Sequence, residues 1–195
     1  MSQGKGKSLS LRGAVPLSHL FLRERVKPGD RVVDATCGNG NDTLLLARLV
    51  GEPGRVWAFD LQEEALAATR RLLAGAGVEE RVELVAAGHE KLADIVREPV
   101  AAVVFNLGYL PGGDKEFITR PATTVAAVAA ALELLLPGGL LLVVIYTGHP
   151  GAAEEEEAVL SRVSVLDPRA YNVWTSRQAN RPPTAPYLVV AEKAG

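Results

Sequence analysis

The sequence predicts an α/β fold, in which a mostly parallel seven-stranded sheet carries helices on both faces. Short apolar runs alternate with helical segments along most of the 195 residues, which requires parallel strands joined by right-handed crossovers. A loop containing Gly38 and Gly40 separates the first apolar run from a helix start. The last two apolar runs have no helix between them, so we expect an antiparallel hairpin at the C-terminal end.

Helix positions are predicted from the spacing of apolar residues and from the residues that interrupt this spacing. Pro53 and Gly54 follow the second helix, and Gly75 and Gly77 terminate the third. The expected helices are 17–26, 42–50, 63–74, 90–96, 123–136 and 154–166. In the first of them, the residues expected to face inward are Leu17, Leu20, Phe21 and Val26.

The strands are expected at the apolar runs 32–34, 55–59, 82–85, 100–105, 140–145, 173–174 and 187–191. The run Leu140 to Ile145 is continuous, which is typical of a strand buried on both faces. In such a sheet a ligand binds at the carboxyl ends of the strands, at the point where the strand order reverses. We therefore expect the site beyond strands one and four.

Composition indicates an ordinary globular protein, with 48% hydrophobic and 23% charged residues. We expect a polar, disordered arm at residues 1–12 and a single domain at residues 13–195. The formal net charge of −2 excludes a global basic field for nucleic acid. The lone Cys37 excludes an internal disulfide and fits a reducing compartment. The sequence shows neither a signal peptide nor an apolar run long enough to span a membrane. We therefore expect a cytoplasmic protein.

The loop after strand one predicts a nucleoside cofactor. Glycines let backbone approach a ligand closely, and the following helix start supplies free N–H groups. Strand two ends in Asp60, whose carboxylate is placed to accept hydrogen bonds from ribose hydroxyls. Asp34 precedes the loop, where it would repel a pyrophosphate, and the third glycine of a dinucleotide fingerprint is missing at Thr43. These two features argue against an NAD-dependent oxidoreductase and favour a ligand with a cationic part.

This loop resembles the acid-x-G-x-G-x-G loop of class I S-adenosylmethionine-dependent methyltransferases, with Thr36 in place of the first glycine. The resemblance implies a Rossmann-like fold and S-adenosyl-L-methionine as cofactor, with S-adenosyl-L-homocysteine as product. Cys37 is expected to be a small loop residue rather than a nucleophile. The candidate cofactor-binding residues are Asp34, Thr36, Cys37, Gly38, Asn39, Gly40, Asn41, Asp42, Thr43, Asp60, Gln62, Gly88, His89 and Asn106.

Strand four ends in Asn106-Leu107-Gly108-Tyr109, which resembles the (Asp/Asn)-Pro-Pro-(Tyr/Phe) motif of methyltransferases that act on exocyclic amines. By that resemblance Asn106 supplies a side-chain oxygen and Leu107 a carbonyl for the target N–H groups, while the Tyr109 ring stacks on the base. Leu107-Gly108 departs from Pro-Pro, so the detailed amine geometry is open.

Taken together, these and further segments of the sequence are similar to the family labelled "putative rRNA methylase", which includes bacterial enzymes that methylate 5-aminomethyl-2-thiouridine in tRNA. The residues that carry the resemblance are 34–43, Gly88-His89, 106–111, 113–115, Thr119, Pro121, 123–124, Tyr146, Gly148-His149 and the segment 177–183. It implies N-methylation of the aminomethyl group at the wobble position to give 5-methylaminomethyl-2-thiouridine, with the tRNA anticodon region as partner.

An alkyl amine is mostly protonated at neutral pH, and methyl transfer needs its lone pair. With a pKa of about 10.4 as the ceiling, freeing the amine at pH 7 costs up to roughly 4–5 kcal/mol. Candidate proton acceptors are Asp114 and His149, with Tyr109 less favoured. His19 is expected to be a surface or core residue without a role in the reaction.

RNA contact is expected from Lys115, Arg120, Arg177 and Arg181, with Lys5, Lys7 and Arg12 as an added arm. A homodimer would widen the footprint of so small a chain, but the sequence leaves the oligomeric state open. No His, Cys or Asp spacing suggests a metal.

Three alternatives stay open: a methyltransferase of the same fold acting on rRNA, one acting on a small-molecule amine, and a non-catalytic nucleoside-binding protein.

Overall fold

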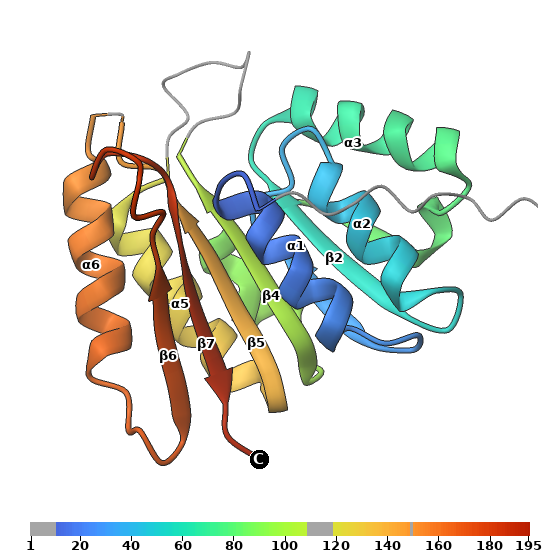
Figure 1. Ribbon diagram of the computed structural model, residues 1–195. Helices are drawn as coiled ribbons and strands as arrows, with labels where there is room; N and C mark the ends of the chain where they lie inside the picture. Colours follow the sequence, from blue (N-terminus) through green and yellow to red (C-terminus); the bar gives the residue numbers. More distant parts are fainter. Residues whose placement is uncertain (1–10, 109–118, 149) are drawn as a thin grey trace, which may run out of the picture.

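The computed structural model describes residues 11–108, 119–148 and 150–195, and these build one seven-stranded sheet flanked by helices (Figure 1). The strand order is β3-β2-β1-β4-β5-β7-β6. Strands β1 to β5 pair in parallel, and β7 is antiparallel to both of its neighbours. The strands are β1 (Arg31–Asp34), β2 (Arg55–Asp60), β3 (Val82–Ala86), β4 (Val100–Leu107), β5 (Leu135–Ile145), β6 (Tyr171–Ser176) and β7 (Tyr187–Lys193). The predicted mostly parallel sheet with an antiparallel C-terminal hairpin is confirmed.

Helices cover both faces of the sheet, and each face has its own apolar core. In Figure 1, α1 and α2 cross in front of the sheet and α5 lies behind it. Alternation along β1 divides the two cores, because Val32 packs on the α1–α2 side and Val33 on the α4–α6 side. The helices are α1 (Ala14–Arg25), α2 (Asn41–Val50), α3 (Glu63–Ala76), α4 (Leu92–Ile95), α5 (Pro121–Leu134) and α6 (Ala152–Ser164), with single 3₁₀ turns at Glu79–Arg81 and His89–Lys91.

The first helix begins three residues before the predicted start. Val26, which follows its last residue, is buried as predicted, but the buried residues within the helix are not the predicted ones. Its buried residues are Ala14, Ser18 and Leu22, whereas Phe21 is 36% exposed. The prediction that Phe21 faces inward is therefore wrong. Ser18 can occupy the core because its hydroxyl donates to the Val15 carbonyl at 2.8 Å, which satisfies the polar group locally.

The helix predicted to end at Leu136 ends at Leu134, and β5 begins directly afterwards. The pairing of β4 with β5 is irregular there: Val100 faces Leu135, but Ala102 faces Leu140. The intervening residues bulge out of the ladder around Gly138, whose φ is 77°. Gly139 passes close to the neighbouring backbone, since an added Cβ would lie 2.8 Å from the Leu136 carbonyl oxygen.

Nothing in the described part of the chain is a helix that combines the length and the apolar character needed to cross a bilayer.

We predict that Gly139→Ala destabilises the fold by about 1–3 kcal/mol, because its methyl group would meet backbone carbonyls that have no rotamer to adopt. The matched control is Gly75→Ala in α3, where an added Cβ meets nothing within 4 Å and where alanine should stabilise the helix by about 0.5–1 kcal/mol. Urea denaturation of both variants measures the difference. Equal free energies of unfolding would contradict the close approach at Gly139.

Candidate active site

The carboxyl ends of three adjacent parallel strands bring the predicted site residues to one edge of the sheet. Asp34 ends β1, Asp60 ends β2, and Asn106 is the penultimate residue of β4. Asp34 is in register with Ala58 on one side and Val104 on the other. The amide N–H of Asn106 donates to Thr36 Oγ1 at 2.7 Å, which joins the end of β4 to the loop after β1.

The loop between β1 and α2 turns at two glycines with left-handed backbone, Gly38 at φ 51° and Gly40 at φ 80°. Gly40 also lies against α3, because an added Cβ would be 2.7 Å from Thr69 Oγ1. The Cys37 side chain points into the core against Ala58, and burial raises the pKa of its thiol. A thiol held protonated in the core is a packing group and a poor nucleophile.

Asp34 lies directly under this loop and is completely buried. Its Oδ2 accepts a hydrogen bond from Thr43 Oγ1 at 2.6 Å, and its Oδ1 accepts one from the Thr36 N–H at 3.3 Å. Burial, followed by the nearby charge of Asp42, raises the pKa of Asp34 to about 7. A carboxyl that is costly to ionise in the free protein will ionise more readily when a cation is bound nearby.

Asp60 ties strand β2 to the same loop. Its Oδ2 accepts the Gly38 N–H and its Oδ1 accepts the Gln62 N–H, both at 2.9 Å. The residue is only half-buried, and each carboxylate oxygen keeps a second lone pair. The Asp60 carboxylate can therefore still accept hydrogen bonds from a ligand hydroxyl. Asn39 and Asn41, at the rim of the loop, are exposed.

Asn106 has one satisfied and one unsatisfied end. Its Nδ2 donates to Asp42 Oδ2 at 2.7 Å. Its Oδ1 is buried and has no hydrogen-bond partner within the described residues. Because a carboxylate only accepts hydrogen bonds, the contact with Asp42 determines which end of the amide is nitrogen. The unpaired oxygen is thus free to accept a hydrogen bond.

His89 is a packed residue of the site. It is buried, and its ring lies edge-on to Phe105 with centroids 5.7 Å apart. Its Nε2 is 3.4 Å from Thr124 Oγ1, and burial lowers its pKa. The lowered pKa favours the neutral ring. Gly88, just before it, is buried as well.

A third buried carboxylate, that of Glu155, connects Thr119 and Thr124, and through Thr119 it reaches Gly108. Glu155, in the first turn of α6, is 1% exposed and accepts hydrogen bonds from Thr119 Oγ1 at 2.7 Å and Thr124 Oγ1 at 2.6 Å. Thr119 Oγ1 accepts the Gly108 N–H at 3.0 Å, and the Thr119 N–H donates to the Gly108 carbonyl at 3.2 Å. The predicted catalytic residues Tyr109, Asp114 and His149 lie outside the described residues.

Besides Glu155, the site contains two residues that the sequence does not assign to it. His19 Nε2, on α1, lies 2.6 Å from Asp42 Oδ1. Tyr146 follows β5, and both burial and the charge of Asp42 raise the pKa of its phenol. The His19 contact joins residues 23 positions apart on two different helices, so no local sequence signal reveals it. In the sequence, Tyr146 stands out only as part of the family resemblance.

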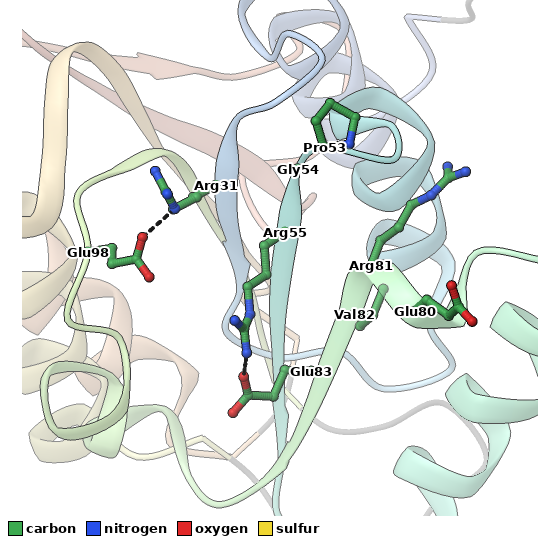
Figure 2. Close-up of a pocket in the computed structure, with 9 residues that line it drawn as sticks. All are labelled: Arg31, Pro53, Gly54, Arg55, Glu80, Arg81, Val82, Glu83 and Glu98. Atoms are coloured by element: carbon green, nitrogen blue, oxygen red, sulfur yellow. Dashed lines mark hydrogen bonds and ion pairs between the residues drawn. The ribbon is translucent and has the colours of Figure 1, made fainter.

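The cavity in Figure 2 lies at the opposite edge of the sheet, where β1, β2 and β3 begin. Its volume is about 440 Å³. Two ion pairs line it, Arg31 with Glu98 and Arg55 with Glu83, as Figure 2 shows. It shares no residue with the loop, Asp60 or Asn106. In the described part of the chain, no group of three or more His, Cys, Asp or Glu side chains could hold a metal ion.

The family described as "Putative rRNA methylase" matches residues 56–192. The chain belongs to this family. An Arabidopsis thaliana protein named "tRNA (mnm(5)s(2)U34)-methyltransferase, chloroplastic" is 42% identical over 186 residues, which cover 90% of this chain and 68% of that protein.

Two solved structures resemble the chain over nearly all of its length. The "putative rRNA-methylase" of Clostridium thermocellum is 45% identical with a TM-score of 0.91, and the match covers 95% of this chain and 100% of that one. A "putative methyltransferase" of Streptococcus mutans, solved in complex with S-adenosylhomocysteine, is 39% identical with a TM-score of 0.85, covering 94% and 99%. This chain is an S-adenosylmethionine-dependent methyltransferase.

We predict that Asp34 makes the protein less stable as pH rises from about 4 to 7. The unfolded carboxyl ionises near 3.8 and the folded one near 7, so between these values the folded state holds a proton that unfolding releases. The free energy of unfolding should fall across this window by an amount on the order of 4 kcal/mol. Urea denaturation of the free protein at several pH values, compared with Asp34→Asn, measures this fall. Parallel curves for the two proteins would disprove it.

We also predict that Glu155→Ala lowers the free energy of unfolding by about 1–3 kcal/mol, because it leaves the buried Thr124 hydroxyl without its acceptor. Glu154→Ala is the control, since Glu154 lies in the same helical turn but is exposed, and its loss should cost under about 1 kcal/mol. Denaturation midpoints compare the two. A larger effect at Glu154 would show that helix electrostatics, and not the threonine network, dominate here.

Proposed function

We propose that this chain methylates the exocyclic aminomethyl nitrogen of 5-aminomethyl-2-thiouridine at the tRNA wobble position, giving 5-methylaminomethyl-2-thiouridine. The observation that carries the proposal is the unpartnered, buried Oδ1 of Asn106 at the carboxyl end of β4. A buried acceptor without a partner suits a substrate that donates an N–H. The name of the Arabidopsis relative, which covers most of this chain, supports tRNA as the substrate.

The residues present fit S-adenosylmethionine. We assign ribose recognition to Asp60 and close backbone approach to the loop at Gly38 and Gly40, beside the α2 N-terminus. Asp34 sits below that loop, where its negative form favours a cationic ligand. The bound cofactor supplies an electrophilic methyl group carried on a sulfonium.

The protein's own contribution is to position the amine. Asn106 Oδ1, together with the Leu107 carbonyl, would accept the two N–H groups and so point the nitrogen lone pair at the methyl group. Asn106 cannot take the proton that the ammonium must lose, because an amide is not basic near neutral pH. That acceptor remains a prediction for Asp114, His149 or Tyr109.

Among the basic residues predicted to meet RNA, Arg177 is engaged within the protein. It pairs with Glu156 at 2.6 Å, stacks 3.4 Å from the Tyr187 ring centroid and donates to the Pro183 carbonyl. We therefore assign phosphate contact to Arg120 and Arg181, which are exposed. Lys5, Lys7 and Lys115 lie outside the described residues.

The test is methyl transfer to tRNA purified from cells that lack this gene, with labelled S-adenosylmethionine and nucleoside mass spectrometry. We expect 5-aminomethyl-2-thiouridine to be consumed as its methylated product appears, with binding that weakens steeply as salt rises. Methylation of rRNA or of a free amine, with the wobble nucleoside unchanged, would overturn the proposal. A flat salt response would remove tRNA as the partner.

We predict that Asn106→Ala lowers turnover at least 100-fold while cofactor affinity, measured by calorimetry, changes by less than about threefold, since its loss misplaces only the amine. Asn172→Ala is the matched control, because Asn172 also donates to a carboxylate but lies on the exposed strand β6. It should leave both quantities unchanged. Loss of cofactor binding in Asn106→Ala would show that Asn106 is structural.

A further inference from the structure

We propose that His19 is a positioning residue for methyl transfer: through Asp42, it fixes the side-chain amide of Asn106 so that Oδ1 faces the substrate amine. The inference rests on the role proposed above for Asn106, and it adds a residue and a mechanism to that site. His19 lies on α1, a helix that contributes none of the sequence-predicted site residues.

Three side chains from three separate elements form one chain of contacts. His19 Nε2 lies 2.6 Å from Asp42 Oδ1, and Asn106 Nδ2 lies 2.7 Å from Asp42 Oδ2. Asp42 is 7% exposed, in the first turn of α2, and Asn106 is at the end of β4. Within the described residues, the two oxygens of one buried carboxylate are divided between a histidine and the amide.

The orientation of that amide decides what the substrate meets. Rotating the Asn106 side chain by half a turn exchanges its oxygen for its NH₂ group, with almost no change in shape. An NH₂ group facing the substrate amine would place two hydrogen-bond donors opposite each other, with no acceptor between them. Asp42 prevents this, because turning the oxygen toward its carboxylate would bring two acceptors together. Donation to a carboxylate also polarises the amide and makes Oδ1 a better acceptor.

The Asp42 carboxylate in turn needs a contact that keeps it in position. Its carboxylate lies close enough to buried Asp34 that its charge raises the pKa of that residue, so repulsion between the two acids works against its position. The histidine contact opposes this repulsion and fixes the Asp42 rotamer. The buried stripe Ala14, Ser18 and Leu22 packs α1 onto the sheet and so brings His19 to the start of α2.

The first test reads the amide directly. In a ¹H–¹⁵N spectrum, the Asn106 side-chain pair, assigned by its absence in Asn106→Ala, should exchange slowly with water and carry one strongly shifted proton. We expect His19→Ala to lose both properties and His19→Gln, which keeps a donor, to retain them. Arg23→Ala, an exposed position on the same helix, is the control and should leave the signal unchanged.

The second test is kinetic. His19→Ala should lower kcat for tRNA methylation about 10- to 100-fold, with the cofactor KM changed less than threefold, and His19→Gln should recover most of kcat. If His19 acts through Asp42, the double variant His19→Ala/Asp42→Asn should be no more than threefold worse than Asp42→Asn alone.

A lowered melting temperature with unchanged kcat and an unchanged amide signal in His19→Ala would overturn the inference, and so would multiplicative effects in the double variant. If the wild-type protein fails to methylate tRNA, the proposed function itself fails. The amide spectra then still decide whether His19 sets the orientation of Asn106.

Discussion

The parallel pairing of β1 with β4 is the constraint on which the site depends. It places Asp34 opposite Val104, so the loop after β1 and the end of β4 emerge side by side. The hydrogen bond from the Asn106 N–H to Thr36 Oγ1 then closes the gap between them. A methyl donor and a methyl acceptor must meet within a few ångströms, and this strand pair brings together the two segments that we propose hold them.

Buried acids give the site its electrostatic character. Asp34, Asp42 and Glu155 are all buried. Asp34 accepts a threonine hydroxyl and a backbone N–H, and Glu155 accepts two threonine hydroxyls. Asp42 contacts a histidine and an amide. Hydroxyls satisfy hydrogen bonding without neutralising charge, so the site stays negative when these acids ionise. A negative, partly desolvated site suits a sulfonium cofactor and an ammonium substrate, and it is costly for a free protein to maintain.

Two hydrogen-bonded chains converge on the end of β4. One runs from His19 through Asp42 to the Asn106 amide, and the other from Glu155 through Thr119 to Gly108. Each begins on a helix, α1 or α6, on opposite faces of the sheet. The end of one strand is thus held from both sides of the molecule, which limits the movement of the groups that would orient the amine.

The sheet, the edge that carries the site and the candidate residues Asp34, Asp60 and Asn106 could be predicted from the amino-acid sequence, because polar residues at strand ends and a glycine bend are local signals. The prediction failed for Phe21, since the face of a short helix depends on what packs against it, and Ser18 could be buried once its hydroxyl bonded Val15. The contact of His19 with Asp42 and the unpaired Asn106 oxygen arise only when the separate elements pack together. These facts depend on atoms from separate elements lying within hydrogen-bond distance, and no spacing along one chain segment encodes such a distance.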